Sequence, residues 1–121
     1  MISRSAVFSY AEHKYNTSPD YPWSNYQHYA TLRHKDSDKW YALVMTVSRE
    51  KLGIAGEGEV DVVNIKCRPD AVGSLRMMKG FLPAYHMNKE HWLTVLLDGS
   101  VPENEVYNLI DDSYQLTEGG Q

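Results

Sequence analysis

Four runs of β-branched and aromatic residues constrain the fold of this chain more than any other feature of the sequence. Such residues favour strands, and each run lies between polar, Gly-containing or Pro-containing segments that are typical of turns and loops. Only a short polar turn, residues 35–38, separates the first two runs, which are therefore predicted to form an antiparallel hairpin. The predicted strands are residues 26–34, 40–47, 60–67 and 92–97.

Three segments show helical features. A serine cap, Ser3 or Ser5, begins the first, and Pro69 and Pro102 suit the first turns of the other two. The predicted helices are residues 3–15, residues 70–78 ended by Gly80, and a last helix that starts at Pro102. The order α-β-β-β-α-β-α predicts an α+β fold with an antiparallel sheet. We expect the terminal helices to pack on the sheet and the strand 92–97 to lie in its interior.

The length of 121 residues fits one domain, residues 1–121, with 117–121 expected to be a frayed tail. Residues 53–58 form a Gly-rich connection with the spacing G-x-x-G-x-G. This spacing matches neither phosphate-binding fingerprint, and no Lys-Ser or Lys-Thr pair follows it. The segment is therefore predicted to be a flexible hairpin tip.

Cys67 is the only cysteine in the sequence, which excludes an intramolecular disulfide and a Cys-x-x-Cys metal site. A reducing compartment fits this usage. The sequence also has no long apolar run and no signal-peptide pattern, so we expect a cytoplasmic protein that does not enter a membrane. A nucleophilic Cys67 would need a neighbouring base, and its place at the end of a predicted strand favours a small buried thiol.

The net charge of −4 is distributed unevenly along the chain. Residues 64–89 hold five basic residues against one acidic residue, a net of +4, whereas residues 91–121 hold six acidic residues and no Lys or Arg. The total argues against a strong nucleic-acid binder. The local excess fits either an ordinary solvated surface or a basic face for a polyanion. The basic residues are Lys66, Arg68, Arg76, Lys79 and Lys89.

The most distinctive motif is H-x-N-K-x-H-W in residues 86–92, followed by a short strand and Asp98-Gly99. It resembles the signature of the MmcQ/YjbR family. The strand beginning at Trp40, the Cys67-Arg68-Pro69 entry to the second helix and residues 101–114 are also similar to that family. The resemblance covers most of residues 26–114, with a longer loop at 53–59.

This resemblance implies a compact α+β fold with an antiparallel sheet. That fold has been likened to a double-wing DNA-binding motif and to secretion-chaperone-like folds. The family has no established enzymatic activity, and the likeness of its fold suggests DNA as the ligand.

The motif also has a structural interpretation of its own. Asn88 can cap a short turn through its side-chain oxygen, and Trp92 would then anchor the next strand in the core. A zinc site at His86 and His91 would need a third ligand, from His28 or His34, and no nucleophile accompanies the pair. We therefore predict neither a metal site nor catalytic residues. An exposed polar cluster of His86, Asn88 and His91, next to Lys89, is a further possibility for binding a phosphate or a carboxylate.

These observations predict a non-enzymatic binding module without a cofactor, with duplex DNA as the leading ligand. Its phosphates would contact the basic residues of 64–89, and the hairpin tips would act as wings along the backbone. The alternative is a protein-interaction or chaperone-like adaptor that uses an exposed aromatic surface. A third possibility is a small-molecule pocket beneath those aromatic residues, which are Tyr21, Trp23, Tyr26 and Tyr29.

Overall fold

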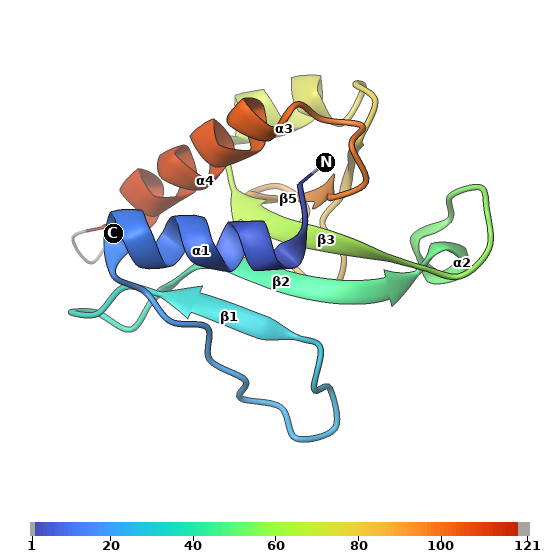
Figure 1. Ribbon diagram of the computed structural model, residues 1–121. Helices are drawn as coiled ribbons and strands as arrows, with labels where there is room; N and C mark the ends of the chain where they lie inside the picture. The colour runs from blue at the N-terminus through green and yellow to red at the C-terminus, as the bar shows by residue number, and fades with distance from the viewer. Residues whose placement is uncertain (1, 119–121) are drawn as a thin grey trace.

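The computed structural model describes residues 2–118 and confirms an α+β fold built on one antiparallel sheet (Figure 1). Its five strands lie in the order β1-β2-β3-β5-β4. The interior position predicted for the strand near residues 92–97 is confirmed, because β5 lies between β3 and β4. In chain order the elements are α1 (Arg4–Tyr15), β1 (Ala30–Arg33), β2 (Trp40–Ser48), α2 (Arg49–Leu52), β3 (Glu59–Lys66), α3 (Pro69–Leu75), β4 (Phe81–Pro83), β5 (Trp92–Leu96) and α4 (Glu103–Thr117).

The helices α1, α3 and α4 cover one face of the sheet (Figure 1). Val7 and Ala11 of α1, Val72 of α3, and Val106 and Ile110 of α4 are buried in one cluster with strand residues of this face. Full burial of such an aliphatic side chain contributes roughly 1.5–3 kcal/mol. The predicted packing of both terminal helices on the sheet is therefore confirmed.

Loops and the short helix α2 cover the opposite face of the sheet. Leu43, Met45 and Val62 are buried there, and partly buried side chains from the segments 23–29 and 82–87 pack against this cluster. In Figure 1 the chain between α1 and β1 runs on the side of the sheet away from α4. This irregular cover lines two of the four hollows described below, and α3 lines the other two.

The first strand is shorter than predicted. It begins at Ala30 because residues 23–29 form turns instead of extended chain. The Tyr26 N–H donates to the Trp23 carbonyl at 3.1 Å, and the Tyr29 N–H donates to the Tyr26 carbonyl at 3.0 Å. The aromatic residues of this segment favour a strand by type, but here their rings pack on the sheet from outside.

Two short elements, α2 and β4, are missing from the predicted order. The segment predicted as a hairpin tip is preceded by α2, whose first turn is capped by the Ser48 hydroxyl and whose end is Gly53 with φ 72°. The strand β4 includes Pro83 and lies at the edge of the sheet, where a missing N–H donor is tolerated. Their brevity explains why residue patterns did not show them.

The second predicted helix ends at Leu75 and not near residue 78, so Gly80 does not terminate it. Gly80 instead has φ 93°, and a Cβ at this position would lie 2.5 Å from Val101 Cγ2. Glycine is needed here because the chain before β4 passes close to residues 100–101. Of the predicted tail, residues 119–121 lie outside the described part of the chain. Within residues 2–118, no helix is both long and apolar enough to cross a membrane.

Candidate functional site

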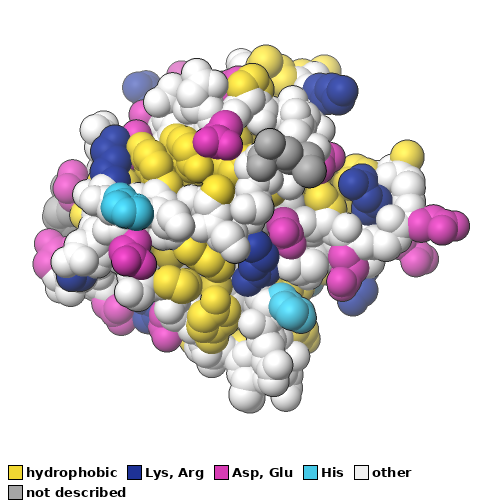
Figure 2. Space-filling model, in the orientation of Figure 1, with side chains coloured by type: hydrophobic (Ala, Val, Ile, Leu, Met, Phe, Trp, Pro, Cys, Tyr) yellow, Lys and Arg dark blue, Asp and Glu magenta, His cyan; other side chains and the backbone are white. Residues whose placement is uncertain are grey.

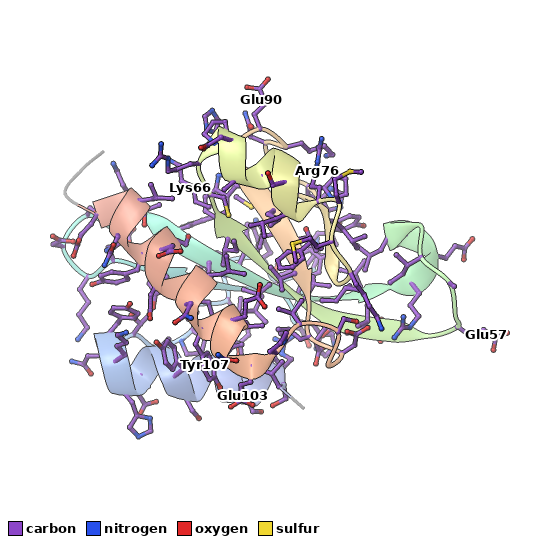
Figure 3. The ribbon with its side chains drawn as sticks, turned by 90° about the horizontal axis from the view of Figure 1, so that it is seen from above. Glu57, Lys66, Arg76, Glu90, Glu103 and Tyr107 are labelled. Atoms are coloured by element: carbon purple, nitrogen blue, oxygen red, sulfur yellow. The ribbon has the colours of Figure 1, made fainter. Side chains whose placement is uncertain are left out.

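The structure brings together two of the five predicted basic residues. Arg76 caps the end of α3, and Lys89 lies in the turn before β5. Both side chains are exposed, and both line a hollow of about 290 Å³ together with Glu90. Figure 3 shows Arg76 and Glu90 near α3, at a distance from Glu57 on the β2–β3 connection.

Lys89 also lines a second hollow, of about 350 Å³, with Lys51 and His86. Lys51 belongs to α2, a part of the chain that the sequence analysis did not connect with this surface. Among residues 2–118, the ion pairs found involve Lys14, Arg33 and Arg68 as cations, and none involves Lys51, Arg76 or Lys89. These cations therefore remain available to an anionic ligand.

The other three predicted basic residues do not line either of these two hollows. Lys66 is at the end of β3, paired in register with Trp92, and it is partly buried. Arg68 lies 3.6 Å from the Asp70 carboxylate, and it lines a different groove. Lys79 is exposed three residues after Arg76. On the face shown in Figure 2, Lys and Arg side chains lie singly with acidic side chains between them, so that face has no broad basic patch.

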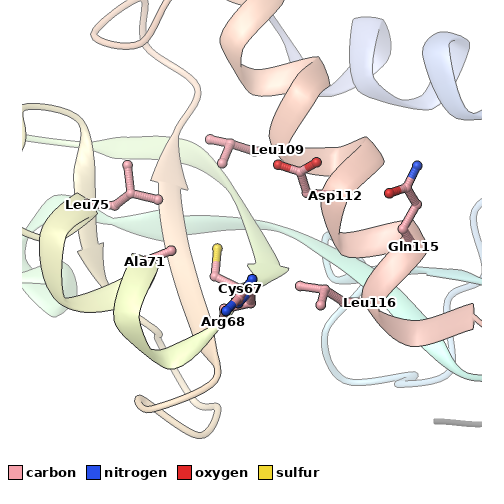
Figure 4. A pocket seen from close by; sticks show the side chains of 8 residues that line it. All are labelled: Cys67, Arg68, Ala71, Leu75, Leu109, Asp112, Gln115 and Leu116. Atoms are coloured by element: carbon pink, nitrogen blue, oxygen red, sulfur yellow. The ribbon is translucent and has the colours of Figure 1, made fainter.

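The groove that Arg68 lines has a volume of about 460 Å³ and lies between α3 and α4 (Figure 4). Its floor includes the buried Cys67, with Asp112 on the opposite wall. Burial and, second, the Asp112 charge raise the pKa of the Cys67 thiol to about 11. A thiol with this pKa is mostly protonated at neutral pH and is a weak nucleophile. The groove therefore lacks an activated nucleophile at Cys67.

The motif turn has the predicted cap. Asn88 Oδ1 accepts hydrogen bonds from the backbone N–H of Glu90 at 2.8 Å and of His91 at 3.1 Å. The Asn88 carboxamide oxygen is thus engaged by the turn itself. His86 lines the hollow with Lys51, whereas within residues 2–118 no hydrogen bond or ring contact joins His86 to His91. Trp92 begins β5 and has most of its surface buried without being fully enclosed.

The absence of a metal site remains a prediction. Of the two possible third ligands, His28 is exposed, and His34 is buried with Nε2 2.7 Å from Thr117 Oγ1. Within residues 2–118, no group of three or more His, Cys, Asp or Glu residues is placed to hold a metal ion.

An aromatic hollow of about 300 Å³ adjoins this basic region. Its floor is Leu43 and Met45 of β2, and its walls come from three separate segments of the chain. The Trp23 ring is nearly perpendicular to Trp40, at 88° with centroids 5.4 Å apart. Tyr26 stacks on Tyr29 with centroids 5.0 Å apart. The residues lining the hollow are Trp23, Tyr26, Tyr29, Trp40, Leu43, Met45, His86 and Met87.

The predicted aromatic surface is divided by this arrangement. Tyr21 and Tyr26 are exposed, whereas Trp23 and Tyr29 are partly buried against the sheet. The pKa of Tyr29 is raised, first by burial and then by the neighbouring tyrosines, foremost Tyr85. Trp40 was not predicted as a partner of these residues, although it packs against Trp23 and lines the same hollow. Its position at the start of a predicted strand was the available signal.

A buried polar pair fixes the chain between the two hollows. Asn64 of β3 and Thr94 of β5 face each other in register and are fully buried. The Asn64 Nδ2 group donates to the Tyr85 carbonyl at 2.9 Å, and the Tyr85 N–H donates to Thr94 Oγ1 at 2.9 Å. Both the N–H and the carbonyl of Tyr85 are thus hydrogen-bonded to buried side chains of the sheet. The next residue, His86, has φ 60°, an uncommon conformation for a residue other than glycine.

The fold and these surfaces define a class of protein: a small α+β domain with three helices on one sheet face and loop-walled hollows on the other. The YjbR family model matches residues 12–116. This chain belongs to the YjbR family, as the resemblance noted in the sequence predicted.

Individual relatives agree with that assignment. The chain is 50% identical over 117 residues to the uncharacterized protein YyaQ of Bacillus subtilis (strain 168), covering 97% of this chain and 99% of YyaQ. A crystal structure of a Pseudomonas syringae protein superimposes with a TM-score of 0.93 at 52% identity, covering 96% of this chain and 99% of that one. A Deinococcus radiodurans protein shares the fold, with a TM-score of 0.75 at 24% identity, over 100% of this chain and 83% of its own.

Proposed function

We propose that this chain is a non-enzymatic, cytoplasmic protein that binds DNA phosphates along the β4 edge of its sheet. The observation that carries the proposal is the chain of cations Lys51, Lys89 and Arg76 on two adjoining hollows. None of these three cations takes part in an ion pair within residues 2–118. Neighbouring cations without partners suit the regularly spaced charges of a nucleic-acid backbone.

The electrostatics set the expected strength of this binding. Contacts from Lys and Arg release counterions, so binding should weaken steeply with salt. The overall charge of −4 and the acidic Glu90 beside Arg76 oppose the contact. The expected dissociation constant is therefore of the order of micromolar, as in non-specific complexes. Phosphate contacts position a protein on DNA without selecting a sequence.

The fold gives separate support. The family's resemblance to a double-wing DNA-binding motif suggests the same ligand, although one fold can serve many functions. The raised pKa of the buried Cys67 thiol supports a non-enzymatic role.

The test is a titration of duplex DNA at low and moderate salt with the unmodified protein and with the triple variant Lys51→Ala, Arg76→Ala, Lys89→Ala. Each phosphate contact that is lost should flatten the logarithmic salt dependence by about one unit. Lys35→Ala is the control, because Lys35 lies in the turn beside β1, at the opposite sheet edge. Unchanged affinity and slope in the triple variant would exclude this face as the contact surface.

A protein-interaction role is the second candidate. The observation that favours it is the exposure of Met77 at 87% and Met78 at 52%, directly between Arg76 and Lys79. Exposed methionines are common on surfaces that bind protein partners. If the unmodified protein binds no DNA at low salt, this second candidate becomes the better interpretation.

A further inference from the structure

Three hollows adjoin one another around the β4 edge of the sheet, from the loop-covered face to α3. His86 lines both the aromatic hollow and the hollow with Lys51 and Lys89. Lys89 in turn lines both that hollow and the one with Arg76. An aromatic surface therefore passes directly into two cationic surfaces. We call these three hollows together the track.

We propose that the track binds single-stranded nucleic acid, with one unstacked base in the aromatic hollow and the adjoining phosphates on Lys51, Lys89 and Arg76. This inference rests on the proposed function and adds to it the form of the nucleic acid. Proteins that hold single strands combine a positively charged groove with aromatic side chains on which bases stack.

The aromatic hollow suits a flat ring. Its volume of about 300 Å³ lies at the lower end of the range for ligand pockets, so it has room for one ring system. The Trp23 ring is nearly perpendicular to both Trp40 and Tyr29, at 88° and 85°. These rings therefore form a corner instead of a closed stack. Tyr26 is 56% exposed and offers an accessible ring at the opening.

The charges around the aromatic hollow favour an anionic or neutral ligand over a cation. Perpendicular aromatic rings can also hold an ammonium group through cation–π contacts. None of the residues that line this hollow is acidic. The Arg33 guanidinium lies 5.9 Å from the centroid of the Trp40 ring but is paired with Asp20 and Asp38. Lys51 and Lys89, which form no ion pair within residues 2–118, lie in the adjoining hollow. A cationic ligand would meet like charge from the adjoining hollow, whereas a base joined to a phosphate meets opposite charge there.

The length of the track favours a strand over a free nucleotide. A single nucleotide would occupy the aromatic hollow and the cationic hollow next to it. The track continues past Lys89 to Arg76, where it offers a further cation. The segment between the hollows is held in place through both backbone groups of Tyr85, so the track is preorganised.

The experiment uses the intrinsic fluorescence of Trp23 and Trp40, with Trp92→Phe as the background that removes the third tryptophan. The probes are an oligothymidylate of about eight nucleotides, the same sequence in a duplex, and thymidine monophosphate. The single strand should quench the fluorescence and bind more tightly than the monophosphate. Duplex DNA should bind through the cations without comparable quenching.

Two tyrosine variants locate the base. Tyr26→Ala should weaken single-strand binding at least about fivefold, which is the lower end of the effect of removing one stacking partner, and should leave duplex binding unchanged. Tyr21→Ala is the matched control, because Tyr21 is 49% exposed on the same segment but does not line the aromatic hollow. Equal effects of the two variants on the single strand would overturn the inference.

The remaining outcomes separate this inference from the proposed function. Equal affinity for the monophosphate and the oligonucleotide would overturn the inference that the ligand is a strand, and would indicate a free nucleotide instead. Duplex binding that depends on Lys89, with no quenching by the single strand, would overturn the inference alone. No binding of either nucleic acid at low salt would overturn both.

Discussion

The Thr94 hydroxyl donates a 2.5 Å hydrogen bond to Asn64 Oδ1 across the pair of strands β3 and β5, and neither side chain reaches solvent. The pair engages the backbone of Tyr85 on both sides. Polar groups buried this deeply are costly unless they are satisfied. Here the Tyr85 backbone satisfies them, and in return they fix the chain that separates the aromatic hollow from the basic one.

Thr94→Val should destabilise the protein by about 1–3 kcal/mol. The substitution keeps the shape of the side chain but leaves the Tyr85 N–H without its acceptor, and an unsatisfied buried group costs about that much. Urea denaturation measures the change. Ser18→Ala, at an exposed position, serves as the control and should lie within about 0.5 kcal/mol of the unmodified protein. Equal stability of Thr94→Val and the control would show that the pair does not hold Tyr85.

Asp111→Asn should loosen the contact between α1 and α4. The Asp111 carboxylate accepts hydrogen bonds from Tyr15 at 2.6 Å, from Tyr10 at 2.8 Å and from Lys14 at 2.8 Å. Burial acts to raise the pKa of Asp111, but the hydrogen bonds from Lys14, Tyr15 and Tyr10 outweigh it and lower the pKa. Loss of the charged acceptor should cost about 1.5–3 kcal/mol at neutral pH.

The pH dependence of this effect has a defined sign. Because the folded-state pKa of Asp111 is lowered, its contribution is present above the unfolded value of about 3.9 and is lost as the pH falls through the folded value. The difference in unfolding free energy between the unmodified protein and Asp111→Asn should therefore shrink toward acid. Urea unfolding at neutral pH and near pH ~3 measures it. Asp112→Asn, on the exposed neighbour, is the control, and a pH-independent difference would contradict the assignment.

Cys67 should react slowly with alkylating reagents in the folded protein. Burial raises its pKa to about 11, so very little reactive thiolate is present at neutral pH. Iodoacetamide labelling followed by mass spectrometry, with and without urea, measures the ratio of rates. If the folded protein is labelled as fast as the unfolded chain, Cys67 is an accessible and reactive thiol, and this prediction is wrong.

Two glycines should respond to alanine in opposite directions. Gly80→Ala would place a Cβ 2.5 Å from Val101 Cγ2 at a φ of 93°, so it should destabilise by about 1–3 kcal/mol. Gly73 lies within α3, where a Cβ would meet nothing within 4 Å. Gly73→Ala should stabilise by about 0.5–1 kcal/mol, since alanine is the better helix former. Thermal unfolding measures the change in melting temperature of both variants. A shift of both melting temperatures in the same direction would contradict these two predictions.

The regular elements were predictable because their patterns are local. Ser3 caps α1 as expected, with its hydroxyl 3.2 Å from the Ala6 N–H, and the turn at Asn88 forms as expected. The end of β1 shows the limit of such patterns. Leu32 pairs with Ala42 but Arg33 pairs with Trp40, which leaves Tyr41 as an extra residue in β2. No sequence pattern marks this irregularity.

The candidate site was predictable only in part, because it joins distant segments. The charge excess in residues 64–89 indicated Arg76 and Lys89, but Lys51 comes from α2, outside that window. The aromatic hollow joins Trp23, Trp40 and Met87, which meet only because the sheet and its loops bring them together. Asn64 carried a usable signal, since it interrupts a run of Val and Ile residues in a strand buried on both faces.

The most direct test of the nucleic-acid site is an NMR titration of the ¹⁵N-labelled protein with a short oligonucleotide at low salt. The amide signals of residues 76–91 and of Lys51 should shift together in a saturable way, and those of α4 (Glu103–Thr117) should not move. The shifts should diminish as salt is added, since the contacts are to phosphates. Shifts concentrated on α1 and α4, or unchanged spectra at every oligonucleotide concentration, would contradict the account.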